Sequence, residues 1–261
     1  ITTLDQYIAS SKQYISIVKT ASRTAVAASW TSVIELAGNP GAGVLAGTST
    51  TAGVVPTDVT AGFPTLNAFA GGTTGYLAQV DFGSSVACRL KLFDCVWKGG
   101  AYAFNANQAL SAQPSYVSRM PGSSYGDTQI WLEQVTAGTG VQNVNVTYTN
   151  QAGATGHTTG VTATAANIVG RMWQLPLQSG DTGVQTITNV AGSVASAGTF
   201  NILVLRPLWS GRIKIANDGD VHAFDRTGMP EVFADSALML AVSPDATATG
   251  IPELELVVAA G

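Results

Sequence analysis

A serine inside a short glycine-bounded motif is the first residue whose setting suggests chemistry. The segment "GSSYG" fits the G-x-S-x-G pattern with Ser124 as the nucleophile, and Asp181 or Asp218 and then His222 follow in the chain order of α/β hydrolases. That arrangement requires a strand before the serine and a helix after it. Here "SRMP" precedes the motif and the strand-like "TQIWLEQV" follows it, so we expect no catalytic triad and no enzymatic activity.

A second motif, "GAGVLA" at residues 41–46, matches the G-x-G-x-x-A form of a dinucleotide-binding loop. Such a loop holds a pyrophosphate because a helix begins at its last glycine and directs its N-terminal amides at the ligand. The following segment, "GTSTTAGVVPTDV", has no helical periodicity. We therefore expect a structural loop on a β scaffold and no cofactor.

Oxygen-bearing side chains gather in "NDGDVHAFD", where Asn217, Asp218, Asp220 and Asp225 could face a cation. The segment lacks the terminal glutamate and the spacing of an EF-hand loop, although calcium sites in β loops use irregular spacings. Calcium binding by this loop stays open, and the simpler interpretation is a solvated turn without a metal.

The two cysteines, Cys88 and Cys95, are seven residues apart. An odd spacing places them on opposite faces of a continuous strand, which disfavours a disulfide between them. No histidine cluster accompanies them to complete a zinc site. We expect two buried, reduced thiols that pack as small apolar side chains.

The whole chain is poor in charge. Of its 261 residues 11% are charged and 46% are hydrophobic, with a mean hydropathy of +0.23, whereas ordinary soluble domains carry roughly 25% charge. The net charge of −4 and the scattered distribution of the 12 basic residues argue against nucleic-acid binding. No apolar run reaches the roughly 20 residues of a membrane span, and the start "ITTLDQYIASSKQY" lacks a secretion-signal pattern. A surface so weakly charged predicts coverage by copies or partners.

Residues 3–19 carry the clearest helical pattern. Thr3 and Gln6 form a capping-box pair, and apolar side chains then recur every three or four residues. We predict an amphipathic arm over residues 1–24 that docks on a neighbour. Its candidate docking residues are Leu4, Tyr7, Ile8, Tyr14 and Ile15.

After residue 25 the chain changes to short β runs separated by glycine, serine, threonine and asparagine. "VQNVNVTYT", the turn "AGATG" and "HTTGVTAT" predict a hairpin, and "TFNILVLRPLW" predicts a central strand that ends at Pro207. "ELELVV" alternates again, which explains Glu253 and Glu255 as solvated positions rather than paired catalytic carboxylates. Together these patterns indicate an all-β sandwich or barrel.

An internal repeat is the most informative feature of the sequence. "LFDCVWKG" (92–99) aligns with "VLRPLWSG" (204–211), "YGDTQIWLEQV" (125–135) with "FADSALMLAVS" (233–243), and "TGVQNVNV" (139–146) with "TGIPELEL" (249–256). The offsets are 112, 108 and 110 residues, about the length of a small β-sandwich. We predict two tandem β-sandwich, jelly-roll-like modules over 25–155 and 156–261, preceded by the helical arm.

The phrases "RLKLFDCVWKGGAYAF", "FNILVLRPLWSGRI" and "DRTGMPEVFADSALML" resemble in texture the structural proteins of bacteriophage particles, in particular those that decorate or cement a capsid. This resemblance implies symmetric copies, with a trimer favoured, that bind the major capsid protein or other virion proteins. It implies a location in the virion after assembly in the host cytoplasm, without direct contact to nucleic acid or membrane. A double jelly-roll major capsid protein and a receptor- or glycan-binding adhesin on a tail or capsid remain alternatives.

Overall fold

The computed structural model describes residues 1, 3–69, 74–105, 107–163, 168–193 and 197–261, and these are nearly all β-structure. The predicted all-β sandwich class is confirmed. The two α-helices among these residues are short, α1 (Leu4–Ala9) and α2 (Phe224–Thr227), and two 3-10 turns span Val117–Arg119 and Pro121–Ser123. Within the described ranges no helix has the length and apolar character that crossing a membrane requires.

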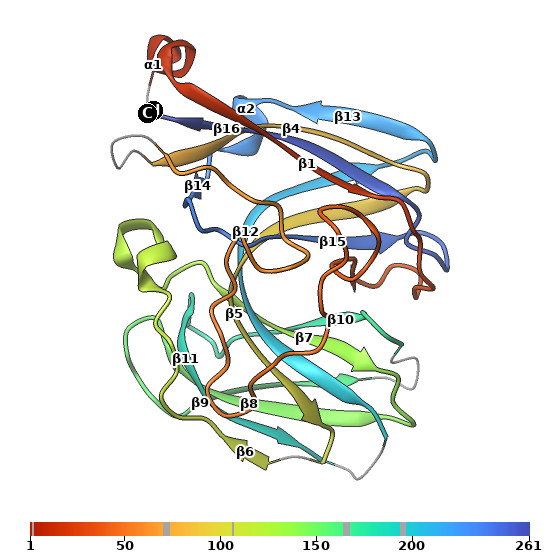
Figure 1. The fold of residues 1–261 in the computed structure, drawn as a ribbon. Helices are drawn as coiled ribbons and strands as arrows, with labels where there is room; N and C mark the ends of the chain where they lie inside the picture. Colours follow the sequence, from red (N-terminus) through yellow and green to blue (C-terminus); the bar gives the residue numbers. More distant parts are fainter. Residues whose placement is uncertain (2, 70–73, 106, 164–167, 194–196) are drawn as a thin grey trace.

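The strands form three antiparallel sheets, which we name upper, central and lower after their places in Figure 1. The upper sheet has the order β13 (Asp218–His222), β4 (Gly75–Ser84), β16 (Pro252–Ala260), β1 (Ser11–Lys19) and β3 (Gly38–Asn39). A short strand, β14 (Glu231–Val232), also pairs with β4. The central sheet has the order β10 (Met172–Leu175), β7 (Gln129–Thr136), β12 (Thr199–Ile213), β5 (Cys88–Ala103), β15 (Leu238–Pro244) and β2 (Thr31–Ser32). The lower sheet has the order β6 (Asn107–Ala109), β11 (Val184–Gly192), β8 (Gln142–Asn150) and β9 (His157–Ala163).

The two long central strands, β5 and β12, connect an upper and a lower sandwich. One end of β5 contributes Leu90 and Leu92 to the core beneath the upper sheet, and its other end contributes Tyr102 to the core above the lower sheet. The opposite face of the central sheet, where Trp131 and Leu203 lie, is a third core. Loop residues Ile34, Leu45 and Phe63 cover this third core, so the loop that holds "GAGVLA" is a packed structural loop.

The sheets are related by an internal two-fold repeat. Read outward from its middle, the central sheet has the same arrangement on both sides, with β12 matching β5, β7 matching β15 and β10 matching β2. The upper order β13-β4-β16-β1 likewise matches the lower order β6-β11-β8-β9. The registers agree as well, because Val146 faces Val190 in the lower sheet as Leu256 faces Val80 in the upper sheet.

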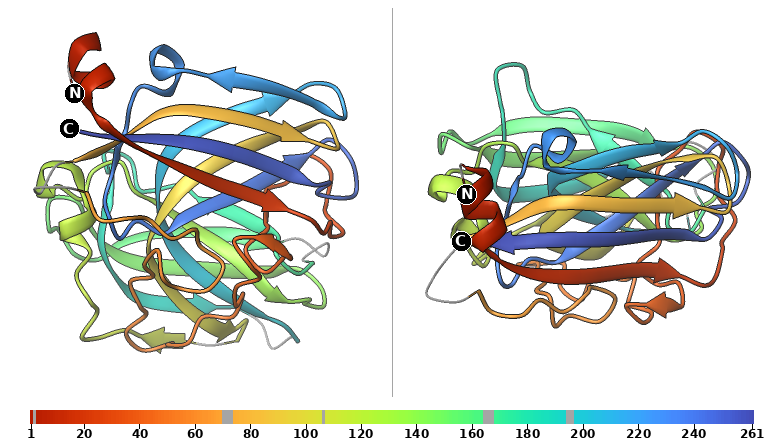
Figure 2. Two further views of the ribbon diagram at one scale, coloured as in Figure 1. Left: turned by 45° about the horizontal axis from the view of Figure 1, so that its top comes forward. Right: turned by 90° about the horizontal axis from the view of Figure 1, so that it is seen from above.

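This arrangement corrects the predicted module ranges. Residue 155 lies inside one hairpin, since β8 and β9 pair with each other in the lower sheet, so 25–155 and 156–261 are not the two sandwiches. The change from one sandwich to the other occurs in the middle of β5 and β12. The upper sandwich combines strands from both ends of the chain, and Figure 2 shows the two termini close together beside β1 and β16. A periodic sequence gives the spacing of a repeat but not its phase, which explains the error.

The predicted helical arm over residues 1–24 is correct only for its first turns. The helix ends at Ala9, and residues 11–19 are strand β1. Ile15 and Ile17 alternate inward on this strand and pack in the upper core. The β-branched residues of "YISIV" fit the strand, and pairing with β16 over eight residues outweighs the helical spacing of the same side chains.

Two other strand predictions have different outcomes. The hairpin of β8 and β9 is confirmed, with Tyr148 opposite His157. Pro207 does not end its strand, because β12 continues to Ile213. The register shifts between Pro207 and Trp209, and the pairing of β12 with β7 stops at Leu205, so the missing proline N–H removes no hydrogen bond on that side.

Candidate interaction surface

The N-terminal helix presents apolar side chains to solvent. Thr3 and Gln6 close the predicted capping box, which fixes the start of the helix. Leu4 and Ile8 are 62% and 65% exposed. The Tyr7 ring lies 6.0 Å from the Phe224 ring on α2, between centroids, so the helix is held against the body. We name the surface of Leu4, Tyr7, Ile8 and Phe224 the apolar arm.

A small hollow lies within the apolar arm. It has a volume of about 210 Å³, and its lining includes Ile1, Leu4, Tyr7, Phe224 and Met229. Phe224 is 49% exposed despite its contact with Tyr7. A hollow bordered by exposed aliphatic and aromatic side chains suits an apolar side chain of a partner.

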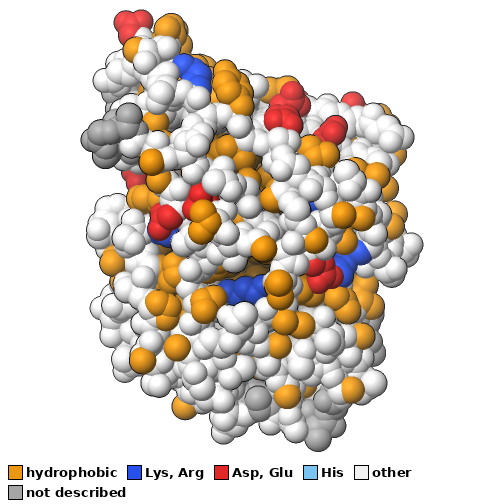
Figure 3. Space-filling model, viewed as in Figure 1, with side chains coloured by type: hydrophobic (Ala, Val, Ile, Leu, Met, Phe, Trp, Pro, Cys, Tyr) orange, Lys and Arg blue, Asp and Glu red, His pale blue; other side chains and the backbone are white. Residues whose placement is uncertain are grey.

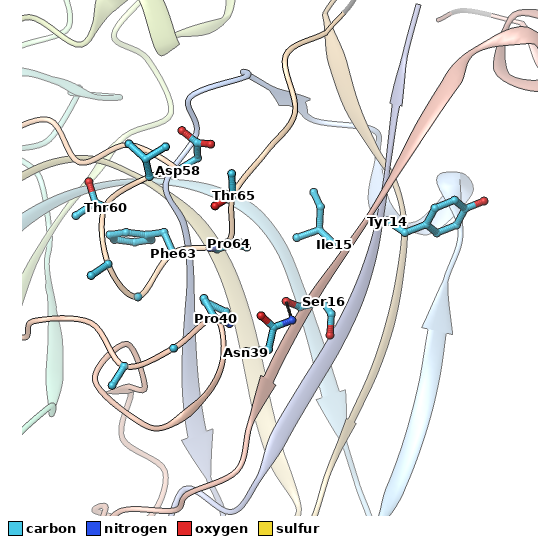
Figure 4. Close-up of a pocket in the computed structure, with 15 residues that line it drawn as sticks. Tyr14, Ile15, Ser16, Asn39, Pro40, Asp58, Thr60, Phe63, Pro64 and Thr65 are labelled. Carbon is cyan, nitrogen blue, oxygen red and sulfur yellow. Dashed lines mark hydrogen bonds between the residues drawn. The ribbon is translucent and has the colours of Figure 1, made fainter.

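The outer edge of β1 borders a larger groove, shown in Figure 4. The groove holds about 560 Å³ between β1, the end of β3 at Asn39, and two loop segments, 40–42 and 58–65. On its outer side β1 pairs with β3 only at Val18 and Lys19, and the Ser16 carbonyl accepts a hydrogen bond from Asn39 Nδ2 at 3.3 Å, so this edge is already partly occupied. Tyr14 is 76% exposed at this edge.

A basic hollow of about 460 Å³ lies between β5, β12 and α2. Five of the 12 basic residues of the chain line it, together with the acidic Asp220: Arg89, Lys91, Arg212, Lys214 and Arg226. Burial lowers the pKa of Lys91, whose Nζ lies 4.8 Å from the Trp30 ring centroid. Neighbouring strands bring these residues together, although the sequence suggests a scattered distribution. The alternation of "RLK" and "GRIK" is the signal that could have revealed it.

The structure places the five predicted docking residues differently. Leu4 and Ile8 are exposed, Tyr7 is half-buried against Phe224, and Tyr14 is exposed on β1. Ile15 is 5% exposed and belongs to the upper core, so it is unavailable to a partner. A helix over 3–19 would place Ile15 on the face of Leu4 and Ile8, whereas a strand turns it inward.

The residues of the G-x-S-x-G motif and of the triad that it would need do not come together. Asp181 bonds His157, with 2.7 Å between Oδ2 and Nδ1, and not His222. His222 instead accepts a hydrogen bond from the Trp209 indole at 2.9 Å. Ser124 Oγ accepts a hydrogen bond from the Gly126 amide in a turn. Burial opposes ionisation of Asp181, but hydrogen bonds from Tyr148, Asn150 and His157 outweigh burial and lower its pKa.

The acidic segment at 217–225 is mostly strand rather than loop. Asp218 and Asp220 lie in β13, where each carboxylate accepts a hydrogen bond from the next backbone amide, Gly219 at 2.9 Å and Val221 at 2.8 Å. The described part of the chain contains no group of three histidine, cysteine or acidic residues arranged to hold a metal ion.

Both cysteines are buried and free, on opposite faces of β5 as their spacing predicts. Burial raises the pKa of the Cys88 thiol and raises that of Cys95 to about 12. Both thiols therefore stay protonated and unreactive near neutral pH.

Comparison with known proteins returns distant similarities. No protein-family model and no curated protein matches the chain. A mutant VP2 protein of infectious bursal disease virus, from T=1 particles, is 9% identical over 96% of this chain and 78% of that chain, with a TM-score of 0.18. A chain from the Gt strain of the same virus is 11% identical over 95% of this chain and 81% of that chain, with a TM-score of 0.17. The VP2 chain of a subviral particle of this virus is 9% identical over 96% of this chain and 81% of that chain, with a TM-score of 0.18. TM-scores this low do not establish a common fold.

Proposed function

We propose that this protein is a structural component of a virus particle, and that it decorates or cements a bacteriophage capsid. The exposed apolar arm is the observation that carries the proposal. Leu4 and Ile8 extend from the body on a short helix, next to a hollow suited to an apolar side chain of a neighbour. Such a surface is costly for an isolated protein and useful for one that is covered after assembly.

The low charge of the visible surface supports the same proposal. Figure 3 shows a face on which apolar and uncharged side chains dominate and charged groups are few. The chain exposes 10330 Å² in total, and a standard interface covers about 800 Å² of each partner. Each neighbour in a trimer, and the shell beneath it, would cover about one such area. Repetition on a symmetric shell adds avidity.

The basic hollow supplies a polar complement to the apolar arm. Helix α2 carries both, since Phe224 faces α1 and Arg226 lines the hollow two residues later. An acidic segment of a neighbouring capsid subunit is the partner that this charge favours. The protein would act by binding and not by catalysis.

The connection of the two sandwiches favours decoration over the alternative of a double jelly-roll shell protein. That alternative implies two complete jelly rolls stacked upright, one for each tandem module. Here β5 and β12 pass through both cores, so the sandwiches share one sheet and lie end to end (Figure 1).

Co-sedimentation with purified capsids lacking the protein tests the proposal. We expect Ile8→Ser, or removal of residues 1–9, to reduce capsid binding at least tenfold while the body stays folded. Val141→Ser is the matched control, because Val141 is 55% exposed on the lower sandwich and its loss should leave binding unchanged. Removing residues 1–20 would instead delete β1 and its core side chains. Equal binding of full-length and truncated chains would reject the proposal.

A further inference from the structure

Three side chains with complementary reactivity meet in the third core: Lys98 on β5, Asn201 on β12 and Glu133 on β7. The order β7-β12-β5 places these three strands side by side. Asn201 faces Glu133 across one ladder, and Lys98 faces Leu203, two residues from Asn201, across the other. The ladder between β12 and β5 shifts register between Phe200 and Ile202, beside Asn201, so Asn201 has no directly opposite residue on β5 in this register.

The three side chains share one carboxylate oxygen. Asn201 Nδ2 donates a hydrogen bond to Glu133 Oε2 at 2.7 Å, and Lys98 Nζ lies 3.8 Å from the same oxygen. Glu133 and Asn201 are 0% exposed and Lys98 is 7% exposed. Glu133 Oε1 is buried and has no hydrogen-bond partner among the described residues. Removing two opposite charges from water costs free energy, and their attraction repays this cost only where the remaining polar atoms are also hydrogen-bonded, which Glu133 Oε1 is not.

The Asn201 amide is polarised at both ends. Its Oδ1 accepts a hydrogen bond from the Gly47 amide at 2.8 Å, and its Nδ2 also donates to the Leu45 carbonyl at 2.6 Å. The Gly47 N–H is thus aimed at the oxygen that gains negative charge when a nucleophile attacks Cγ. Lys98 Nζ is held nearby by the Val44 carbonyl at 3.2 Å.

From this arrangement we propose that Lys98 and Asn201 form an intramolecular isopeptide bond. Glu133 takes a proton from the Lys98 ammonium, and the neutral Nζ attacks Asn201 Cγ. The Gly47 amide stabilises the tetrahedral oxyanion. Glu133 returns the proton to Nδ2, the Cγ–Nδ2 bond breaks, and the second Nζ proton also leaves with the departing group. The products are one Nζ–Cγ amide bond and one ammonium ion, so the chain becomes lighter by the mass of one ammonia, and no oxidant or co-reactant is needed.

The site opens to a small pocket through which ammonia can leave. This pocket holds about 180 Å³, and Val44, Gly47 and Lys98 are among its lining residues. The bond would join the two longest strands covalently and stiffen the sheet that both sandwiches share.

The internal repeat shows that the fold does not require these residues. By strand register, Ser210 opposite Lys91 occupies the place of Lys98, while Arg89 and Ser243 occupy the places of Asn201 and Glu133. None of these three equivalent positions carries a lysine, an asparagine or a glutamate. The equivalent end therefore acts as an internal reference that cannot form the bond.

Intact mass spectrometry of the purified, denatured full-length chain tests the inference. We expect a mass lower than the sequence mass by one ammonia, and a branched tryptic peptide that joins the Lys98 and Asn201 segments with no cleavage after Lys98. Glu133→Gln should abolish the loss. Lys98→Arg should restore the full mass too, whereas a succinimide elsewhere in the chain would survive that substitution.

The mass of the wild-type protein tests the proposed isopeptide bond even where a variant fails to fold. Folded protein that keeps its full sequence mass after prolonged incubation, and is cleaved after Lys98 once denatured, would overturn the inference. A mass loss retained in Lys98→Arg would overturn it as well. Neither result would bear on capsid binding, which depends on the arm.

Discussion

Asp94 and Arg206 face each other across β5 and β12 at the centre of the internal repeat, with Arg206 Nη2 3.3 Å from Asp94 Oδ2. They are also equivalent positions of the repeat, since 206 − 94 equals the offset of 112 between the aligned segments. The two-fold relation therefore passes through this pair. At this centre the two equivalent positions of the repeat pair with each other, and they carry opposite charges.

Removing the Asp94 carboxylate should destabilise the fold severely. Asp94 is 0% exposed, bonds Arg119 and Arg206, and accepts hydrogen bonds from Ser236 Oγ at 2.8 Å and the Ala237 amide at 3.0 Å. Asp94→Ala leaves two buried guanidinium groups without their anion, which costs about 3–5 kcal/mol. Urea denaturation measures this loss.

An exposed ion pair provides the control for Asp94. Arg212 and Asp245 are 3.8 Å apart, with half-exposed side chains. Arg212→Ala should change the free energy of unfolding by less than about 1 kcal/mol. Similar losses for the two variants would contradict the assignment of the Asp94 cluster as the centre of the fold.

The stability of the upper sandwich should depend on pH through His222. Trp209 Nε1 donates a hydrogen bond to His222 Nδ1, so this nitrogen must be unprotonated. Burial lowers the pKa of His222 below its ordinary 6.5, and the charge of Arg226 lowers it further. Asp220 and Asp225 oppose this shift. The unfolded chain binds the proton more readily. This contribution is thus complete above pH 6.5 and is lost as the pH falls from there through the lower folded-state pKa.

Urea midpoints at pH 7.5 and pH 5 measure the His222 effect. Wild-type protein should lose more stability between these values than His222→Gln, which keeps a hydrogen-bond acceptor for the indole but does not titrate. Parallel losses in the two proteins would show that His222 does not carry this pH dependence.

Gly53 is required by its backbone and by the neighbouring tryptophan. Its φ is +66°, and a Cβ there would lie 2.2 Å from the Trp97 ring. Gly53→Ala should lower the melting temperature clearly more than Gly180→Ala. Gly180 also has a positive φ, of +93°, but a Cβ there meets nothing within 4 Å, so the comparison separates the clash from the backbone strain. Equal effects would refute the close packing of this loop on Trp97.

The strand assignment of residues 11–19 gives a separate prediction. Ile17 is 2% exposed and Tyr14 is 76% exposed. Ile17→Ala should cost about 2–5 kcal/mol, because it leaves a cavity in the upper core, while Tyr14→Ser should leave stability nearly unchanged. A large loss for Tyr14→Ser would contradict the strand.

Much of the architecture follows from the sequence because it depends on local alternation. The alternation of Val144, Val146 and Tyr148 with polar residues fixes which face of β8 is buried, and the glycine-rich turn fixes the hairpin. The repeat was visible because Trp97 and Trp209 occupy equivalent places in two cores. The boundary of the sandwiches was not predictable, since nothing local marks the middle of a continuous strand.

The candidate surfaces were harder to predict because they depend on contacts distant in sequence. Leu4 and Ile8 are exposed as expected, but Ile15 turns inward on a strand that pairs along most of its length with the C-terminal β16. The basic hollow and the cluster of Lys98, Glu133 and Asn201 each combine strands far apart in the chain. Their residues carry no local motif, so only the strand register reveals them.

A cryo-EM reconstruction of virus particles assembled in the presence of this protein shows whether it belongs to a capsid shell. We expect density for the double sandwich at symmetry-related positions on the shell, with Leu4, Ile8 and Phe224 covered by a neighbouring subunit. A particle without that density, or one in which the helix Leu4–Ala9 and its hollow face open solvent in every copy, would contradict this proposal.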